Sequence, residues 1–499
     1  MGYDILILHS LSDQSRQTTI DHVLCYRRYL TEHNYTYHHI NAPVTDDLQR
    51  TRFDVVIFNY CFLGHRTASN FNTHRARYRW LADVHAVKIG IPQDDFLCNE
   101  LLDQWLEELG VDVIFSPISS GLSTLYPRNY GRVPFRLVLT GYVDRDQLIR
   151  LQAFDVPHSE RPIDVGSRVR FTRPHYGRFG RYKGYQAEAF RQFAERAGFQ
   201  VNMATDPNEV LVGDDWLRFL GKCKFTVGTK GGASLNDPVG DLRRCCDEYL
   251  VANPDAPFDE VEAACFAGLD GRYEFSAISP RLFEAAAART CQILTPDTYV
   301  GDLEPYVHYL PLERDLSNIE EVFELMRDQD RVTQIIAACY EALVAPDTFE
   351  YKTFAARVLD EIDAFTDRVA QTVEEREESH RHLNAYRRRI ESYERIEDSL
   401  GPTLADVAQR LLLVNFRQEQ TDLVAELVDL VRQRGDRLSA EQMRPLLSRD
   451  PVNARVHEFT VELLSRAHER GALGDVETWL GDIEAGLLSE VNLHGWRRL

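Results

Sequence analysis

The sequence predicts an α/β protein with two doubly wound domains, followed by an all-helical C-terminal extension. Three observations lead to this prediction. Short apolar runs recur along the first two thirds of the chain, helical patterns separate them, and beyond residue 348 only helical patterns remain. Strands that alternate with helices form parallel sheets with helices on both faces. The length of 499 residues allows about three domains.

The first series of apolar runs defines an N-terminal domain, which we place at residues 1–160. Its buried parallel strands are expected at YDILIL (3–8), DVVIFN (54–59), AVKIGIP (86–92) and VDVIFS (111–116). Ligands of doubly wound domains bind beyond the carboxyl ends of the strands. The segments HSLSDQS, NYCFLGHR and PQDDF follow three of these strands, so their polar residues are candidates for contact with a ligand.

A second series defines another α/β domain, which we place at residues 161–347. Its strands are expected at IDVGSRVR (163–170), KFTVGT (224–229) and CQILTP (291–296). The helical patterns GYQAEAFRQFAERAG and SPRLFEAAAAR lie between them. We expect a cleft between these two consecutive domains.

The remaining residues are predicted to be helical. Residues 348–400 form a crossover and a highly charged helix, in which Leu383, Tyr386 and Ile390 lie at heptad-like spacing. Either a short coiled coil or a solvated connecting helix fits this pattern. Residues 401–499 contain amphipathic helices, and we expect a helical bundle that forms a homo-oligomer or docks a partner.

Composition limits the partners of the chain. With 57 basic and 78 acidic residues its formal charge is −21, which makes it a poor candidate for binding nucleic acid or an anionic membrane. The N-terminus lacks the features of a signal peptide, and no apolar run approaches the roughly 20 residues of a membrane span. The nine Cys residues contain no CxxC pair, so we expect reduced thiols in a cytoplasmic protein.

A basic, glycine-rich segment follows the first strand of the second domain. In VRFTRPHYGRFGRYKGYQ (169–186), glycines such as Gly180 allow the backbone to approach a ligand, and the start of the next helix favours anions. The basic side chains could neutralise the charge that develops on a diphosphate leaving group. Such a segment can also be a plain loop.

A second glycine-containing loop, VGTKGGASLNDPVGD (227–241), follows the next strand. Gly231 and Ser234 could contact a ligand there. The alternative is an ordinary strand-to-helix turn in which Ser or Asp caps the helix.

The string ISPRLFEAAAARTCQIL (278–294) reads as a capped helix that leads into a buried strand. Ser279 is a suitable N-cap and Pro280 suits the first helical position. Arg281 and Glu284 are three residues apart, so they share a helix face near its positive end. This arrangement suits a phosphate-bearing ligand, with Glu284 accepting a hydrogen bond from a sugar hydroxyl. Alternatively, Glu284 only complements the helix dipole.

That helix and the segment YVGDLEPYVHYLPLERDLSN (299–318) together resemble the nucleotide-sugar half of glycosyltransferases of the GT-B type. In these enzymes two Rossmann-like domains face each other. The strings SPRLFEA and HYLPLERD are similar to those of the spore-maturation-like branch of bacterial glycosyltransferases.

The resemblance implies a site for a nucleoside-diphosphate sugar. It assigns Arg181 and Lys183 to the diphosphate and Glu284 to the ribose. Many family members have a further glutamate, eight positions earlier, that contacts the donor sugar. Ser276 stands at that position here, so the sugar contact is left open.

The resemblance also draws attention to Tyr299, Gly301 and His308. They lie in the segment whose backbone faces the donor sugar in the family. His308 fits equally well as a structural residue beside Tyr309.

The acceptor side offers several candidates for a general base. Asp94 and Asp95 end an apolar strand, and a carboxylate at that edge could deprotonate an acceptor hydroxyl. We favour Asp95, with Asp13, His9 and His65 as rivals. Each of them could equally well hold a loop in place.

We therefore expect a hexosyltransferase-like enzyme that moves a sugar from a nucleoside-diphosphate sugar to an unknown acceptor, in bacterial glycan or glycoconjugate assembly. The acceptor could be a glycan, a protein or a small molecule. No metal or other cofactor is expected, because the Asp-x-Asp strings at residues 144–146 and 328–330 fit chance occurrence. Two alternatives stay open: a nucleotide-sugar epimerase or phosphorylase on the same fold, and a non-catalytic scaffold that binds nucleotide sugars.

Overall fold

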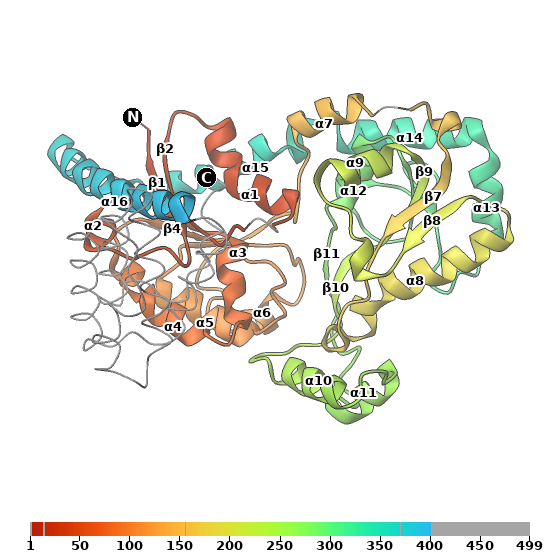
Figure 1. Cartoon of the computed structure of the whole chain (residues 1–499), viewed down its shortest axis with the longest axis horizontal. Helices are drawn as coiled ribbons and strands as arrows, with labels where there is room; N and C mark the ends of the chain where they lie inside the picture. Colours follow the sequence, from red (N-terminus) through yellow and green to blue (C-terminus); the bar gives the residue numbers. More distant parts are fainter. Residues whose placement is uncertain (1, 13–14, 155, 370, 401–499) are drawn as a thin grey trace, which may run out of the picture.

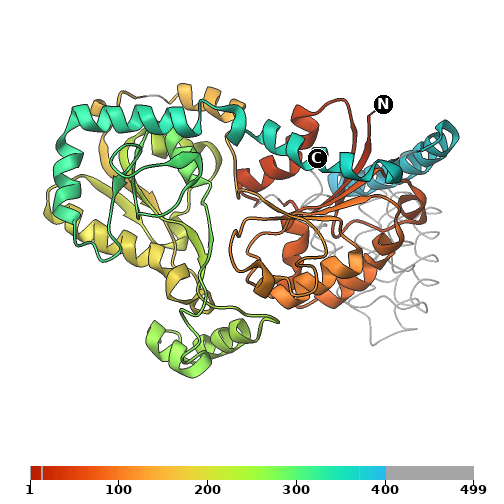
Figure 2. The same ribbon diagram turned by 180° about the vertical axis from the view of Figure 1, so that it is seen from behind.

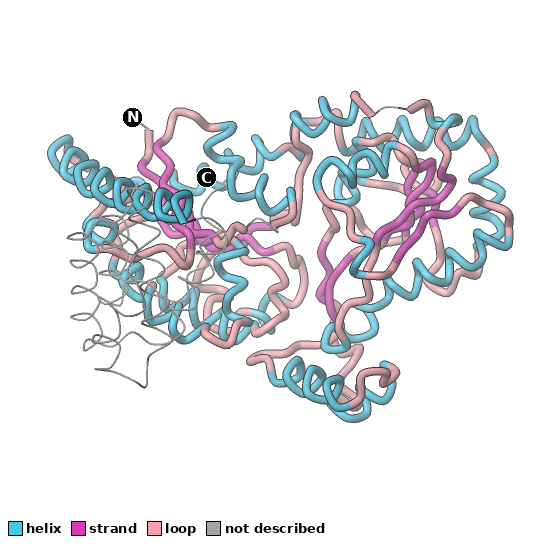
Figure 3. Tube along the Cα trace, in the orientation of Figure 1, coloured by secondary structure: helices cyan, strands magenta, loops and turns pink. Residues whose placement is uncertain are grey.

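The computed structural model describes residues 2–12, 15–154, 156–369 and 371–400. Figure 1 shows two α/β domains side by side, with a pair of helices, α10 and α11, projecting below them. Figure 3 shows that each domain contains its own sheet. The strand pairs in both sheets are parallel, which confirms the α/β prediction. The helical bundle predicted at residues 401–499 lies outside the described residues.

The sheet of the N-terminal domain has the strand order β2-β1-β3-β4-β5-β6. Its strands are β1 (Asp4–His9), β2 (Asn34–His39), β3 (Val55–Phe58), β4 (Val87–Gly90), β5 (Val113–Ser116) and β6 (Phe135–Leu137). Ile5 and Ile7 of β1 pack with α1 (Gln17–Tyr29) on one face, whereas Leu6 and Leu8 pack with α5 (Asn99–Leu109) on the other. Both faces are covered, which explains why the central strands are mainly apolar.

The sheet of the second domain has the order β13-β12-β9-β7-β8. Its strands are β7 (Ile163–Arg168), β8 (Val201–Ala204), β9 (Cys223–Gly228), β12 (Cys291–Leu294) and β13 (Leu310–Pro311). The covering helices include α8 (Gly177–Arg196), α9 (Gly213–Gly221), α12 (Arg281–Ala287), α13 (Ile319–Arg327) and α14 (Gln329–Leu343). In both domains the first strand therefore lies between the second and the third.

Two neighbouring chain segments connect the domains. Residues 138–144 lead from β6 to α7 (Arg145–Gln152), and the chain returns after α14. The two crossings are hydrogen-bonded to each other, because Val143 donates to the Phe349 carbonyl at 2.7 Å and Tyr351 donates to the Val143 carbonyl at 3.1 Å. The returning chain forms α15 (Tyr351–Asp360), which packs on α1 of the N-terminal domain.

The charged helix α16 (Val373–Leu400) also lies on the N-terminal domain (Figure 2). Leu383 and Tyr386 are buried in the core of that domain, and Ile390 packs against the same cluster. The Tyr386 hydroxyl lies 2.7 Å from Nδ1 of the buried His38. These contacts use the residues that the sequence places at heptad spacing.

A helical arm extends from the second domain toward the N-terminal one. The two-stranded sheet β10 (Gly231–Ala233) and β11 (Phe275–Ala277) leads into α10 (Asp241–Ala252) and α11 (Phe258–Cys265). Asp237 and Pro238, just before α10, accept hydrogen bonds from the backbone of Cys98 at 2.9 Å and Glu100 at 3.0 Å. The arm thus joins the two domains on the side opposite the chain crossings (Figures 1 and 2).

The arm also corrects one expectation from the sequence. Cys245 and Cys265 form a disulfide, so the thiols are not all reduced in this structure. The two residues are 20 positions apart in the sequence, and the packing of α10 against α11 brings their Cα atoms to 5.6 Å. Separately, no helix in the described part of the chain is both long and apolar enough to span a membrane.

Candidate functional site

A cavity of about 380 Å³ lies between the two domains and is lined by residues of both. This volume is typical of a small-molecule site. In each domain the first and third strands are neighbours whose chains continue to opposite sides of the sheet, and ligands bind at such a switch point. The loops after β1, β7 and β9 all contribute to the lining, so the switch points of the two domains share one cavity.

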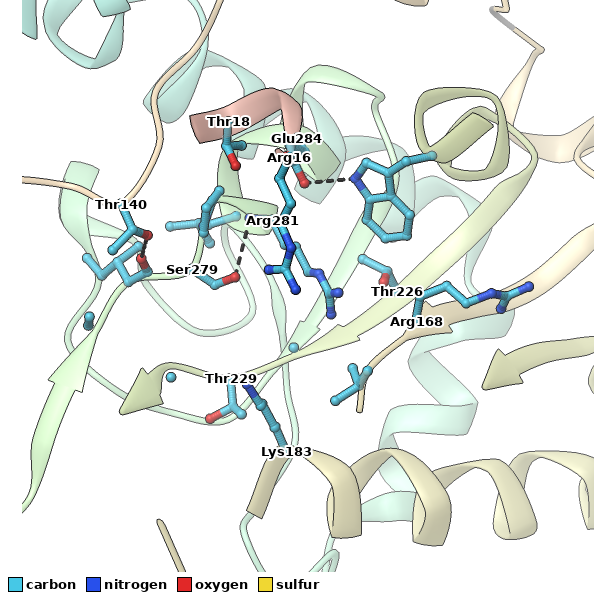
Figure 4. Close-up of a pocket in the computed structure, with 18 of the residues that line it drawn as sticks. Arg16, Thr18, Thr140, Arg168, Lys183, Thr226, Thr229, Ser279, Arg281 and Glu284 are labelled. Atoms are coloured by element: carbon cyan, nitrogen blue, oxygen red, sulfur yellow. Dashed lines mark hydrogen bonds between the residues drawn. The ribbon is translucent and has the colours of Figure 1, made fainter. Parts of the chain in front are cut away.

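Five basic residues line this cavity without an acidic partner in the described part of the chain. Arg168 ends β7 and Arg170 follows it, Arg16 precedes α1, Lys183 lies in α8 and Arg281 begins α12. None of them forms an ion pair with a carboxylate among the described residues, although the whole chain carries a formal charge of −21. Figure 4 shows Arg16 and Arg281 beside each other, with Lys183 projecting from α8. The site therefore has positive charge available for an anion.

The cations in the cavity lower the pKa values of their neighbours. Burial, and then the neighbouring Arg281, lower the pKa of Lys183 to about 8. Burial also lowers the pKa of Arg281, with a contribution from Arg16. Like charges held close together raise the free energy of the empty site. A bound anion with more than one negative charge would relieve this repulsion.

Glu284 lies at the same end of the cavity. Its Oε2 accepts a hydrogen bond of 2.8 Å from the indole N–H of Trp216, and the Arg281 guanidinium lies 5.3 Å from the centre of the Trp216 ring (Figure 4). Burial raises the pKa of Glu284, while Trp216 and Arg281 oppose that rise. Oε1 has no hydrogen-bond partner among the described residues, so it can accept a hydrogen bond from a ligand hydroxyl.

The neighbours Asp94 and Asp95, which follow β4, have different surroundings. Asp95 is completely buried, and its Oδ2 accepts hydrogen bonds from Ser116 at 2.5 Å and from Tyr126 at 2.6 Å. It does not line the cavity. Asp94 does line the cavity, and its carboxylate has no hydrogen bond or ion pair with a described residue. Of the two, only Asp94 can reach a ligand there.

The other residues of the basic segment have structural contacts instead. Arg181 donates to the Thr172 carbonyl at 2.7 Å and lies over the ring of Phe171, so it does not line the cavity. Gly180 approaches β10 so closely that an added Cβ would come within 2.6 Å of the Gly232 carbonyl oxygen. Gly180 therefore serves packing between α8 and the arm.

Ser234 is likewise buried outside the cavity. Its Oγ donates to Asp270 at 2.6 Å and accepts from the backbone of Phe179 at 3.1 Å. Gly231, three residues earlier, does line the cavity. The loop after β9 therefore offers its backbone to a ligand, while its serine joins the arm to α8.

Tyr299 lines the cavity, but the two residues grouped with it do not. The Tyr299 hydroxyl donates to the Thr295 carbonyl at 2.8 Å. Gly301 has a φ of 72° and packs against α14, where an added Cβ would lie 3.0 Å from Leu343. His308 accepts a hydrogen bond of 2.9 Å from the backbone of Glu304 within its own loop.

The remaining catalytic candidates lie elsewhere. His9, the last residue of β1, is completely buried. Its Nδ1 accepts a hydrogen bond of 3.1 Å from the backbone of Leu11, and burial lowers its pKa. It does not line the cavity. Asp13 lies outside the described residues. Within the described chain, no group of three or more His, Cys, Asp or Glu residues is arranged to hold a metal ion.

The structure adds site residues that the sequence pattern did not single out. Arg16, Arg170 and Trp216 line the cavity, as does Asp94, which we had ranked behind its neighbour. The position of Arg16 in the sequence could have indicated it, because Arg16 ends the polar loop that follows the first strand. Nothing local to Trp216 indicates that α9 would bring it to Glu284.

Comparisons with known proteins give structural likeness only. No protein-family model and no curated protein matches the sequence. An α-glucosyltransferase solved with UDP and a DNA 13-mer is 12% identical, with a TM-score of 0.44 over 73% of this chain and 100% of that chain. Anabaena HepE, solved with UDP-glucose, is 11% identical, with a TM-score of 0.39 over 72% and 100%. AviGT4, a glycosyltransferase of avilamycin A biosynthesis, is 11% identical, with a TM-score of 0.35 over 72% and 97%. At these values the function has to be read from the cavity itself.

Proposed function

We propose that the protein is a glycosyltransferase that takes a sugar from a nucleoside-diphosphate donor bound in the interdomain cavity. The observation that carries this proposal is the convergence of the unpaired cations Arg16, Lys183 and Arg281 from both domains. A diphosphate is the common biological anion that would engage several cations at once.

The neighbouring residues extend the donor site in the proposal. The free Oε1 of Glu284 accepts a hydrogen bond from a ribose hydroxyl, while Trp216 keeps the carboxylate in position. Gly231 and Tyr299 line the part of the cavity assigned to the donor sugar.

In the reaction, negative charge grows on the diphosphate as its bond to the sugar breaks. The cations of the cavity stabilise that charge more strongly than they stabilise the intact donor, which lowers the barrier. Contacts from both domains also favour closure around the donor, which excludes water and limits hydrolysis. Residue side chains supply the positive charge in this proposal.

The finer assignments belong to the same proposal. They are a GT-B-type enzyme of the spore-maturation-like branch, a hexose as the transferred sugar, a place in bacterial glycan assembly within the cytoplasm, and oligomerisation through the C-terminal helices. Support for them comes from the strings SPRLFEA and HYLPLERD and from the chain's composition.

Thermal unfolding with a ligand panel tests the proposal directly. A ligand that binds only the folded protein raises its Tm. The panel contains UDP, GDP and dTDP, together with UDP-glucose, UDP-N-acetylglucosamine, GDP-mannose and dTDP-glucose. We expect one nucleoside diphosphate and its sugar conjugates to raise the Tm, and the triple variant Arg16→Ala/Lys183→Ala/Arg281→Ala to lose the shift. No shift with any ligand in folded protein contradicts the proposal, and binding without any turnover favours the scaffold alternative.

A further inference from the structure

Asp94 differs from the other acidic residues that line the cavity in its backbone conformation. Its φ of 52° lies in the left-handed region, which Asp tolerates better than most residues but which still opposes folding. The carboxylate faces the cavity and has no partner among the described residues. A free carboxylate on a strained turn calls for an explanation beyond the stability of the turn.

A buried arginine fixes this conformation from behind. Arg66 is 2% exposed and uses its guanidinium to hold backbone carbonyls of the turn, donating to Asp94 at 2.8 Å and to Gln93 at 3.0 Å. It also donates to the carbonyls of Leu97 at 2.8 Å and Leu63 at 3.1 Å. All four bonds go to the backbone, so Arg66 positions the turn and leaves the Asp94 carboxylate unneutralised by contact.

Asp94 belongs to the N-terminal domain, whereas Lys183 and Arg281 belong to the second domain. The cavity between them therefore has the Asp94 carboxylate on one wall, together with Arg16, and the cations Lys183 and Arg281 on the other. A displacement at the anomeric carbon needs this polarity, with a proton acceptor on the side of the incoming hydroxyl and positive charge on the side of the departing diphosphate.

We propose that Asp94 is the catalytic base that takes the proton from the acceptor hydroxyl, with Arg66 as its positioning residue. The assignment rests on the proposed glycosyl transfer. The acceptor O–H proton moves to the Asp94 carboxylate while the acceptor oxygen forms a bond to the anomeric carbon. The bond from that carbon to the diphosphate oxygen breaks, and its electron pair leaves with the diphosphate. A single displacement of this kind inverts the anomeric configuration.

Protonation of Asp94 should account for the fall of the rate at low pH, which we call the acid limb of the pH–rate profile. Burial raises its pKa, and the charged and titratable groups that face it are Arg66, Lys183, Arg16, Tyr60, Tyr176 and Asp95. The rate should therefore rise as pH increases through the pKa of Asp94, because only the ionised carboxylate accepts a proton. It should fall again as Lys183 loses its proton near pH 8.

The test uses the full-length protein and the nucleotide sugar from the panel that raises its Tm. Release of the nucleoside diphosphate is followed with water, and then methanol, as the acceptor. Asp94→Asn should lower the release rate by about 100-fold or more, the usual scale for losing a general base. It should keep the full Tm shift with the donor and lose the acid limb. Asp94→Glu, which retains a carboxylate, should recover part of the rate, and the methyl glycoside should be inverted.

Asp302→Asn is the matched control. Asp302 has nearly the same backbone conformation, with a φ of 49°, but does not line the cavity. It should leave the rate unchanged. An unchanged rate in Asp94→Asn, a loss of its donor-induced Tm shift, a retained configuration or a wild-type protein that binds donor without releasing diphosphate would each overturn the role of Asp94. Absence of any donor-induced shift in the wild type would instead overturn the proposed function on which that role rests.

Discussion

The end of β4 and the start of α8 present the same contrast on opposite walls of the cavity. After β4, Asp94 lines the cavity while Asp95 is buried with two hydrogen bonds. Near the start of α8, Lys183 lines the cavity while Arg181 stacks on aromatic rings outside it. In each pair, two residues of one charge lie within two positions of each other, yet only one can meet a ligand. The direction of the side chain therefore separates a residue that serves the ligand from one that serves the fold.

Replacing Lys183 and Arg181 separately by alanine tests this contrast, and it has the largest expected effect. Lys183→Ala should lower turnover by about 100- to 1000-fold, because the lost charge would act on the leaving diphosphate in the transition state. Donor binding should weaken less than turnover. Arg181→Ala should leave turnover within about twofold, with at most a small loss of stability. Steady-state kinetics of nucleoside diphosphate release would measure both, and equal losses in the two variants would contradict the contrast.

Replacement of Asp95 and replacement of Asp94 should change the free energy of unfolding to different extents. Asp95→Ala removes the acceptor of two buried hydrogen bonds and leaves the Tyr126 hydroxyl without that partner. We expect the free energy of unfolding to fall by about 2–4 kcal/mol. Asp94→Ala should lower it by no more than about 1 kcal/mol, since its carboxylate has no hydrogen-bond partner among the described residues and only the better tolerance of Asp for the left-handed conformation is lost. Urea denaturation of the three proteins makes the comparison, and a larger loss for Asp94→Ala would count against it.

Within the proposed donor site, Glu284 and Trp216 can be compared by the affinity of their variants for the nucleoside diphosphate. Glu284→Ala should weaken binding of the nucleoside diphosphate by about 1–3 kcal/mol, the scale of a charge-assisted hydrogen bond to a hydroxyl. Isothermal titration with the nucleoside diphosphate that raises the Tm gives the affinity directly. Trp216→Phe is the companion variant, because it removes the indole N–H that holds the carboxylate but keeps Glu284 and an aromatic ring, so its loss should be smaller. Full affinity in Glu284→Ala would remove the ribose contact from the proposal.

The smallest effect concerns pH. Lys183 binds its proton with a pKa of about 8 in the empty cavity, so it is largely charged at pH 7 and largely neutral at pH 9. Binding of a diphosphate favours the charged form, hence affinity should fall as pH rises through 8, by at most about tenfold by pH 9. In Lys183→Arg the charge persists and the affinity should stay nearly flat. A wild-type affinity that does not change between pH 7 and 9 would show that Lys183 does not meet the anion.

Much of the architecture could be predicted because the central strands bury both faces and are mainly apolar. The edge strand β2 escaped prediction, since its sequence NYTYHH is polar and its buried His38 is satisfied by Tyr78 and Tyr386 from distant parts of the chain. The strands β6, β8 and β13 also lie at sheet edges: β6 and β8 are only partly buried, and β13 has just two residues.

Of the candidate site, the sequence could predict only residues that are brought together by their spacing within one helix. Arg281 and Glu284 share a helix face, and both line the cavity. Residues two apart on a helix point in nearly opposite directions, and the phase of α8 that separates Arg181 from Lys183 is set by packing against β10 and the arm. Likewise the turn that separates Asp94 from Asp95 depends on Arg66, which lies 28 residues earlier in the sequence.

The arm has a mechanical consequence for the whole molecule. A domain tied to its neighbour at one place can swing away in any direction, whereas a domain tied at two separated places can rotate only about the line that joins them. The chain crossings near Val143 and the backbone hydrogen bonds of Asp237 and Pro238 are two such places on opposite sides of the cavity. While both hold, we expect the domains to move mainly by rotation about that axis, so that the closure proposed around the donor would be a twist of one wall of the cavity against the other.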